Sequence, residues 1–207
     1  MGERELRIVF MGTPAFAVPS LRAISTLRDD GCDAAVVVGV ITQPDRPAGR
    51  GKRLTAPPIK EAAGAAGLPV FQPESLRRPE ALSLVESLAP DLIVVAAFAQ
   101  ILPRAILKLP RYHCINVHAS LLPLYRGASP ISAAIRDGRQ ETGVSIMQME
   151  AGLDTGPILS QVHMPIDDDD TTESLTMKLA DIGARELRAI IDPLASGEVE
   201  SKPQDGS

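Results

Sequence analysis

The sequence predicts an α/β protein with a Rossmann-like, open, mostly parallel twisted sheet and helices on both faces. Apolar, β-branched runs over residues 6–11, 34–41 and 91–98 are separated by segments with helical patterns, which is the order of β-α-β units. The later two runs are apolar at successive positions, as expected of strands that helices cover on both sides. The first run ends in a glycine turn that leads directly into a helical pattern, as at the start of a Rossmann-like sheet.

The turn after the first strand shows how the chain enters its first helix. Thr13 is expected as the N-cap and Pro14 as the first helical residue. The turn contains one glycine, Gly12, whereas a dinucleotide site needs the pattern G-x-G-x-x-G. We therefore expect no NAD or FAD site.

The rest of the chain continues the alternation of strands and helices. The last helix is expected to take Asp170 as its N-cap, with Glu173 three residues later, and to end or kink near Pro193. We assign the acidic run 167–170 to a solvated approach to this helix, because four adjacent acids in a loop do not converge on one metal ion. The other expected elements are helices over 59–66, 79–88 and 130–136, and strands at 70, 114–118, 143–149 and 158–164.

Composition narrows the class of protein. A chain of 207 residues without a second core predicts one domain over residues 1–195 and a polar tail over 196–207. A net charge of −5 argues against a protein whose whole surface attracts nucleic acid. With 3% aromatic residues and no tryptophan, a surface that stacks bases on aromatic side chains is also not expected. No run approaches the ~20 apolar residues of a membrane span, and no signal peptide is recognised. We expect a cytoplasmic monomer whose Cys32 and Cys114 are reduced thiols, with Cys114 buried in a strand.

Three polar residues form the candidate catalytic group. Asn116 and His118 are two positions apart near the end of a strand, so their side chains leave on the same side. Asp154 lies in a tight turn between two glycines. An amide, an imidazole and a carboxylate can together transfer protons and stabilise an oxyanion. Each residue has a structural alternative: His118 as a core histidine, Asp154 as a turn cap, and Asn116 as a partner of a neighbouring strand. His113 and His163 have no such partners, so we expect structural roles for them, and we expect no metal.

A cationic loop over residues 42–58 is the second candidate site. It is rich in proline and glycine and carries Arg46, Arg50, Lys52 and Arg53 within an acidic protein. Long loops of this kind are often functional, and several cations together can hold phosphates without reading bases. The alternative is a mobile surface excursion.

Taken together, these motifs resemble the folate-dependent formyltransferases, and within that family the branch that acts on methionyl-tRNA. The resemblance covers residues 6 to about 205. It rests on the pattern Asn116-x-His118-x-Ser120-Leu-Leu-Pro123 with Asp154-x-Gly156, on Phe10-Met-Gly-Thr-Pro14, on Thr42-Gln-Pro-Asp-Arg-Pro-Ala-Gly-Arg-Gly-Lys52 and on Gly143-Val-Ser-Ile-Met-Gln-Met149.

The resemblance implies a reaction and a role for each matching residue. A formyl group would pass from 10-formyltetrahydrofolate to the α-amino group of methionine on charged initiator tRNA. Asn116 would donate to the oxyanion, His118 would handle protons or stabilise the intermediate, and Asp154 would orient His118 and favour its charged form. The tRNA acceptor end would meet the cations of the loop and Arg126. The folate would contact Phe98, Gln100, Ile101, Leu102, Ser120, Leu121, Leu122, Pro123, Met149 and Gly152.

The chain also departs from the family pattern. Phe98-Ala99 stands where Tyr-Gly is usual and Ala119 where glycine is common, which we expect to reshape the folate pocket slightly. Leu124 occupies a position that is often basic, so one phosphate contact is lost. The resemblance further implies a carboxyl-terminal β-barrel that helps to hold tRNA, with residues 196–207 as the start of the linker to it.

Two other functions remain open at this stage. One is a formyltransferase for a small amine, either a sugar nucleotide or glycinamide ribonucleotide; the single-domain size favours it and the cationic loop opposes it. The other is a catalytically silent folate- or RNA-binding module, which the presence of Asn116, His118 and Asp154 opposes.

Overall fold

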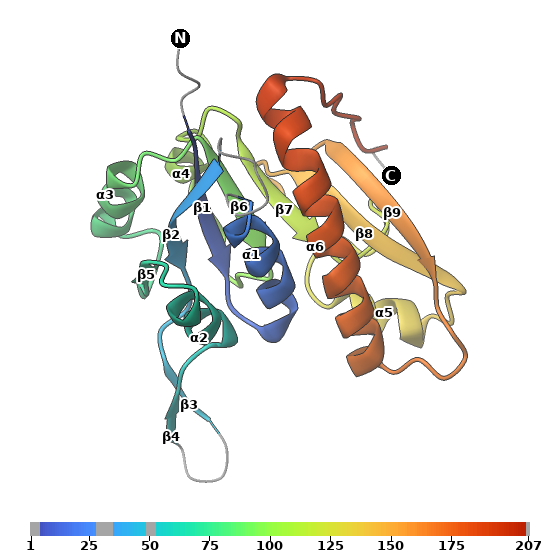
Figure 1. The fold of residues 1–207 in the computed structure, drawn as a ribbon. Coiled ribbons are helices and arrows are strands. Elements are labelled where there is room, and N and C mark those ends of the chain that lie inside the picture. Colours follow the sequence, from blue (N-terminus) through green and yellow to red (C-terminus); the bar gives the residue numbers. More distant parts are fainter. Residues whose placement is uncertain (1–4, 28–34, 49–52, 206–207) are drawn as a thin grey trace.

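The structure is a computed structural model that describes residues 5–27, 35–48 and 53–205. Its main sheet has seven strands in the order β5-β2-β1-β6-β7-β8-β9, and Figure 1 shows helices on both faces. The parallel strands are β1 (Leu6–Gly12), β2 (Ala35–Ile41), β5 (Val70–Phe71), β6 (Leu92–Ala96) and β7 (Cys114–His118). The strands β8 (Glu141–Gln148) and β9 (Ile158–Pro165) are antiparallel. The predicted fold class is confirmed.

Two apolar cores lie against the sheet, one on each face. Alternate residues of β1 enter different cores: Ile8 and Phe10 join one, and Val9 and Met11 the other, as the period of two in a strand requires. The first core is covered by α1 (Val18–Ser25), α2 (Pro58–Ala65), α5 (Pro130–Arg136) and the long α6 (Thr172–Ser196). The second is covered by α3 (Pro79–Ser87) and α4 (Arg104–Leu107), of which α4 was not predicted.

The long helix α6 lies close to the strand that carries the candidate catalytic residues. A Cβ on Gly183 would come within 2.8 Å of Val117 Cγ1, so glycine is needed at this point of contact between α6 and β7. Since β7 is also buried between β6 and β8, its backbone is supported from three sides. This support limits the movement of the two polar residues at its carboxyl end.

The expected strands match the observed ones within two residues where the structure describes both, and so do the helices expected over 59–66, 79–88 and 130–136. Both expected helix caps were wrong. The first helix begins with a 3₁₀ turn, η1 (Ala15–Ala17), whose N-cap is Pro14 and which has no side-chain cap. Thr13 Oγ1 donates to the Phe98 carbonyl at 3.3 Å. At α6 the N-cap is Thr171, whose side chain accepts from the Ser174 N–H in a capping box.

Two further differences concern prolines and loops. Pro193 lies inside α6, which continues to Ser196 and ends at Gly197 with a φ of 74°. Proline has no N–H, so the helix continues past Pro193 with one backbone hydrogen bond fewer. The loop expected at 42–58 contains an antiparallel hairpin of β3 (Arg46–Ala48) and β4 (Arg53–Thr55), which projects away from the main sheet in Figure 1. Among the described residues, no helix is long and apolar enough to cross a membrane.

Candidate active site

The carboxyl ends of the parallel strands bring the candidate residues to one edge of the sheet. Thr13 follows β1, Gln43 follows β2, Phe98 follows β6, and His118 ends β7. The Phe98 carbonyl accepts hydrogen bonds from Thr13 Oγ1 and from Gln43 Nε2, each at 3.3 Å. Ligands of open α/β sheets bind at this edge, so these residues frame one continuous candidate site.

The structure brings Asn116, His118 and Asp154 together. Asn116 Nδ2 donates to Asp154 Oδ1 at 3.4 Å, and His118 Nδ1 lies 3.7 Å from Asp154 Oδ2. The side chains of His118 and Asp154 are only 7% and 13% exposed. A low-dielectric setting strengthens the interaction of such groups with a charge that develops beside them.

The second ring nitrogen of His118 is also engaged. Nε2 lies 3.0 Å from the Tyr125 carbonyl oxygen, and since a carbonyl only accepts, Nε2 carries a proton in this arrangement. The contact between Nδ1 and Asp154 Oδ2 is longer, at 3.7 Å, and is therefore the weaker of the two. A substrate group can compete for Nδ1 more readily than for Nε2.

The turn that carries Asp154 is held tightly. Asp154 has a φ of 51°, a left-handed conformation that is uncommon outside glycine. Its Oδ2 accepts from the Gly127 N–H at 2.8 Å. A side chain on Gly156 would collide with the Gln148 carbonyl, so only glycine fits where the turn passes β8. The carboxylate is thereby directed at β7.

A buried polar network fixes the loop after His118. Ser145, which pairs with His118 across β7 and β8, donates to the Ser120 carbonyl at 2.6 Å and accepts from the Leu122 N–H at 3.0 Å. Gln161 Nε2 on β9 donates to the Leu122 carbonyl at 2.8 Å and to Ser145 Oγ at 2.9 Å. We had not singled out Ser145 or Gln161, although a serine within an apolar strand beside His118 was a usable signal.

The residues expected to contact folate form three segments with different exposure. Phe98, Leu102, Ser120 and Leu122 are buried, and Ser120 Oγ is engaged by the Leu124 carbonyl at 2.6 Å. Leu121, Pro123 and Met149 are half-buried, whereas Ile101 and Gly152 are exposed. The buried members shape the wall of this region, and the exposed ones lie where a ligand could reach them.

Gln100 stands out in this group. Its Oε1 accepts from the Leu76 N–H at 2.9 Å, which fixes the amide. Its Nε2 is buried, and among the described residues it has no hydrogen-bond partner. A buried donor without an acceptor is costly, and an acceptor on a bound molecule would remove that cost.

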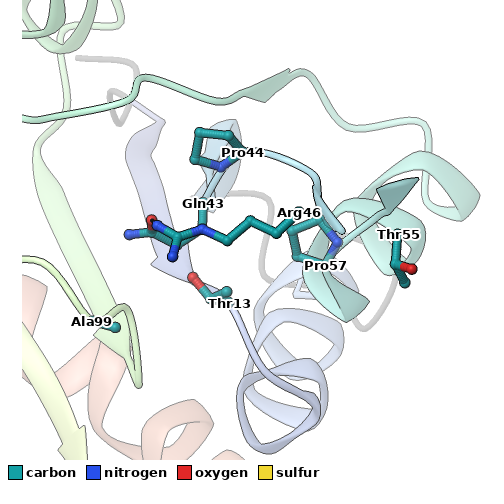
Figure 2. A pocket seen from close by; sticks show the side chains of 7 residues that line it. All are labelled: Thr13, Gln43, Pro44, Arg46, Thr55, Pro57 and Ala99. Carbon is teal, nitrogen blue, oxygen red and sulfur yellow. Dashed lines mark hydrogen bonds between the residues drawn. The ribbon is translucent and has the colours of Figure 1, made fainter. Parts of the chain in front are cut away.

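A cavity of about 400 Å³ lies beside the hairpin (Figure 2). The Arg46 side chain extends along it and donates from Nη2 to Gln43 Oε1 at 3.2 Å. Sequence reasoning had not identified Thr13 or Gln43 as binding residues, although both follow carboxyl ends of parallel strands. The cavity is lined by Thr13, Gln43, Pro44, Arg46, Thr55, Pro57 and Ala99, so it adjoins the expected folate region only at Ala99.

The base of the hairpin is anchored by charge. Asp45 accepts from Gln72 Nε2 at 2.7 Å and from Lys60 Nζ at 2.7 and 2.8 Å. The pKa of the Asp45 carboxyl is lowered, first by the Gln72 hydrogen bond and then by Lys60. Of the expected cations of this loop, Arg46 lines the cavity and Arg53 is exposed; Arg50 and Lys52 lie outside the described residues.

The remaining candidates have other surroundings. Arg126 Nε donates to Gln204 Oε1 at 2.9 Å in the carboxyl-terminal tail. Cys114 is buried, and its burial raises the thiol pKa to about 12, which leaves no reactive thiolate. His113 is exposed, and His163 is exposed beside Glu141, with 3.2 Å between Nδ1 and Oε2. Among the described residues, no group of three or more His, Cys, Asp or Glu could hold a metal ion.

An amide, an imidazole and a carboxylate at the carboxyl edge of an open α/β sheet make up a candidate site for proton transfer and oxyanion stabilisation. The family comparison gives the particular class: residues 6–191 match the family described as "Formyl transferase". The chain belongs to this formyl transferase family, which confirms the family that the motifs indicated.

Individual relatives agree with that membership. The chain is 57% identical to the methionyl-tRNA formyltransferase of Acidithiobacillus ferrooxidans, over 96% of this chain and 62% of that protein. It is 54% identical to the protein of the same name from Halalkalibacterium halodurans, over 97% of this chain and 61% of that protein. The chain thus spans about three fifths of the length of these relatives.

Solved structures share the fold. Glycinamide ribonucleotide transformylase 1 from Symbiobacterium toebii superposes with a TM-score of 0.80 at 24% identity, covering 99% of this chain and 96% of that one. A sugar N-formyltransferase from Shewanella superposes with a TM-score of 0.73 at 19% identity, covering 98% and 74%. At these identities the likeness concerns the fold alone.

Proposed function

We propose that this chain transfers a formyl group from 10-formyltetrahydrofolate to the α-amino group of methionyl-initiator tRNA. The observation that carries the proposal is the meeting of Asn116, His118 and Asp154 at the carboxyl end of β7. The choice of methionyl-tRNA as the acceptor is supported by relatives named methionyl-tRNA formyltransferase, which are 57% and 54% identical to this chain.

The chemistry requires a site for one negative charge and a route for one proton. The amine nitrogen attacks the formyl carbon, a new C–N bond forms, and the carbonyl oxygen becomes an oxyanion. Collapse of this intermediate breaks the bond to the folate N10, which takes up the proton that the amine loses. The reaction needs no metal or redox change, since the nucleophile and the leaving group are both nitrogen.

Asn116 is placed to hold the oxyanion. Its Nδ2 donates one hydrogen bond to Asp154 Oδ1 at a long distance of 3.4 Å. An amide nitrogen has a second hydrogen, which can be donated to the oxyanion. Because Asp154 fixes the amide before the reaction, little reorganisation is needed when the charge develops.

His118 is placed to move the proton. Nε2 remains bound to the Tyr125 carbonyl at 3.0 Å, whereas Nδ1 has only the 3.7 Å contact with Asp154. Nδ1 is therefore the atom that exchanges a proton between the amine and the folate nitrogen. Asp154 stabilises the imidazolium that exists while the proton is in transit.

The formyl donor and the acceptor occupy different parts of the edge. Gln100 Nε2, a buried donor that has no partner among the described residues, fits a polar acceptor of the folate beside Phe98 and Leu102. The acceptor end of the tRNA approaches from the hairpin, where Arg46 lines a cavity of about 400 Å³. Arg53, which is exposed on β4, supplies a phosphate contact on the same side.

A small-amine formyltransferase is the second candidate, because an enzyme of that class has the same fold. The chain superposes over 99% of its length on a glycinamide ribonucleotide transformylase with a TM-score of 0.80. The hairpin and the higher identity to the methionyl-tRNA enzymes oppose it.

The deciding experiment measures formyl transfer from 10-formyltetrahydrofolate by this 207-residue chain. Charged initiator tRNA, glycinamide ribonucleotide and an amino sugar nucleotide are offered separately. We expect formylation of methionyl-tRNA, with a rate that falls as salt rises. Activity confined to a small amine would replace our proposal by the second candidate. Folate binding without transfer to any acceptor would indicate a binding module.

A further inference from the structure

The carboxyl-terminal tail returns to the candidate active site. After α6 the chain runs back to β9, where the Ile158 N–H donates to the Lys202 carbonyl at 2.7 Å and the Lys202 N–H donates to the Ile158 carbonyl at 2.8 Å. This bridge places residue 204 beside the turn that carries Asp154. The tail lies beyond residues 6–191, the region that the family comparison covers.

Gln204 binds two segments of the site with one side chain. Its Nε2 donates to the Asp154 carbonyl at 2.9 Å and to the Gly156 carbonyl at 2.7 Å. Its Oε1 accepts from Arg126 Nε at 2.9 Å. Both hydrogens of the amide and its oxygen are therefore engaged, and the side chain is half-buried.

The two carbonyls that Gln204 holds belong to a turn with a demanding conformation. Asp154 has a φ of 51°, which non-glycine residues adopt only where their surroundings impose it. Fixing the carbonyls of Asp154 and Gly156 fixes the peptide planes around the Asp154 Cα. The carboxylate is then directed at His118 Nδ1, Asn116 Nδ2 and the Gly127 N–H.

We propose that Gln204 is a positioning residue for formyl transfer, acting through the backbone of the Asp154 turn. This inference rests on the proposed function, because it assumes that Asp154 supports the reaction. Without the two hydrogen bonds the turn loosens and the carboxylate leaves its place beside His118. Since a displacement of ~1 Å can cost ~10²-fold in rate, we expect kcat to fall roughly 10- to 100-fold while the KM for the formyl donor stays within about threefold.

Two substitutions separate the contacts of Gln204. Gln204→Glu keeps an oxygen for Arg126 but cannot donate to the two carbonyls when ionised. Gln204→Met keeps the length of the side chain and removes all three contacts. Gln140→Ala, at an exposed glutamine before β8, is the matched control for loss of an amide. All three are made in the full 207-residue chain.

The first readout does not depend on the reaction. The Gly127 N–H donates to Asp154 Oδ2, so its hydrogen exchange, measured by NMR, reports whether the carboxylate stays in place. We expect Gln204→Glu and Gln204→Met to speed this exchange at least ~10-fold, in line with the loss of a hydrogen bond, and Gln140→Ala to leave it unchanged. Unchanged exchange in Gln204→Glu would overturn the proposal.

The second readout is the kinetic one. A lowered kcat with a nearly constant donor KM in both Gln204 variants supports the positioning role. Faster Gly127 exchange with an unchanged kcat overturns it, because the turn would then move without consequence for the reaction. If the wild-type chain formylates no acceptor, the proposed function fails, and the Gly127 exchange still decides whether Gln204 holds the turn.

Discussion

The proposed catalytic corner consists of Asn116, His118, Asp154 and the loop after His118. It and the hairpin β3–β4 both follow carboxyl ends of parallel strands, but they are built in opposite ways. In the catalytic corner, the loop after His118 is bound by Ser145 and Gln161, and Asp154 is bound by the Gly127 N–H. In the hairpin, all three residues of β4 are exposed, and Leu54 is 72% exposed.

In the function that we propose, this difference separates two tasks. An oxyanion and a moving proton need donors that are fixed before the reaction, and the catalytic corner supplies them through buried hydrogen bonds. A large acceptor needs a surface that it can reach, and the hairpin supplies exposed cations on a base anchored by Asp45 and Lys60. We expect changes in the catalytic corner to alter kcat and changes in the hairpin to alter acceptor binding.

The largest effect is expected from His118→Ala. Loss of a positioned acid or base costs about 10²–10⁴ in rate, so kcat for formyl transfer should fall by that factor while binding of labelled tRNA persists. The measurement is single-turnover formylation at saturating donor. His163→Ala, which removes an exposed histidine beside Glu141, is the matched control. A His118 variant that retains more than about a tenth of the wild-type rate would contradict the role.

Asn116→Ala tests the other half of the catalytic corner. Loss of one oxyanion donor costs about 10²–10³ in kcat, with little change in the KM for either substrate, because the charge exists only in the intermediate and the transition states that flank it. Steady-state kinetics with both substrates varied give the comparison. A raised donor KM with a normal kcat would instead make Asn116 a binding residue.

Charge removal in the hairpin should have a smaller effect of a different kind. Arg46→Gln and Arg53→Gln are each expected to reduce the slope of log affinity for tRNA against log salt by about 0.7–0.9, with kcat at saturating tRNA nearly unchanged. Filter binding over a salt series measures the slope. Arg77→Gln, at an exposed arginine before α3, is the control. Equal slopes in the hairpin variants and the control would remove the hairpin from tRNA binding.

The sequence predicted the parts of the molecule that depend on local pattern. Apolar runs predicted the strands of the sheet, and the spacing of Asn116 and His118 predicted their common side. The N-cap of α6 was wrong by one residue because an adjacent hydroxyl and carboxylate compete for the same role: Thr171 caps α6, while Asp170 binds Lys178 and Ser174.

Contacts between residues far apart in the sequence could not be predicted from local pattern. The tail was expected to be polar, but only the fold shows that Gln204 lies against a turn 50 positions earlier. The cavity beside Arg46 likewise joins the hairpin to residues that follow β1, β2 and β6, and no local signal relates them. The network of Ser145 and Gln161 lies between these cases, since both are polar residues in strands that pack against the catalytic loop.

The smallest expected effect concerns stability at the start of α6. Hydrogen bonds from Lys178 and then Ser174 lower the pKa of Asp170 from its ordinary 3.8 to about 2. Because the folded state binds this proton more weakly than the unfolded state, the stabilisation is complete above about pH 4 and is lost as the pH falls towards 2. Lys178→Met should therefore narrow the difference between urea midpoints at pH 6 and pH 2.5, relative to wild type and to Lys108→Met at an exposed lysine. An unchanged difference would show that the Lys178 contact is not needed for the lowered pKa, which the hydrogen bonds from Ser174 Oγ and the Asp167 N–H would then maintain. Formylation kinetics at neutral pH should remain normal in either case.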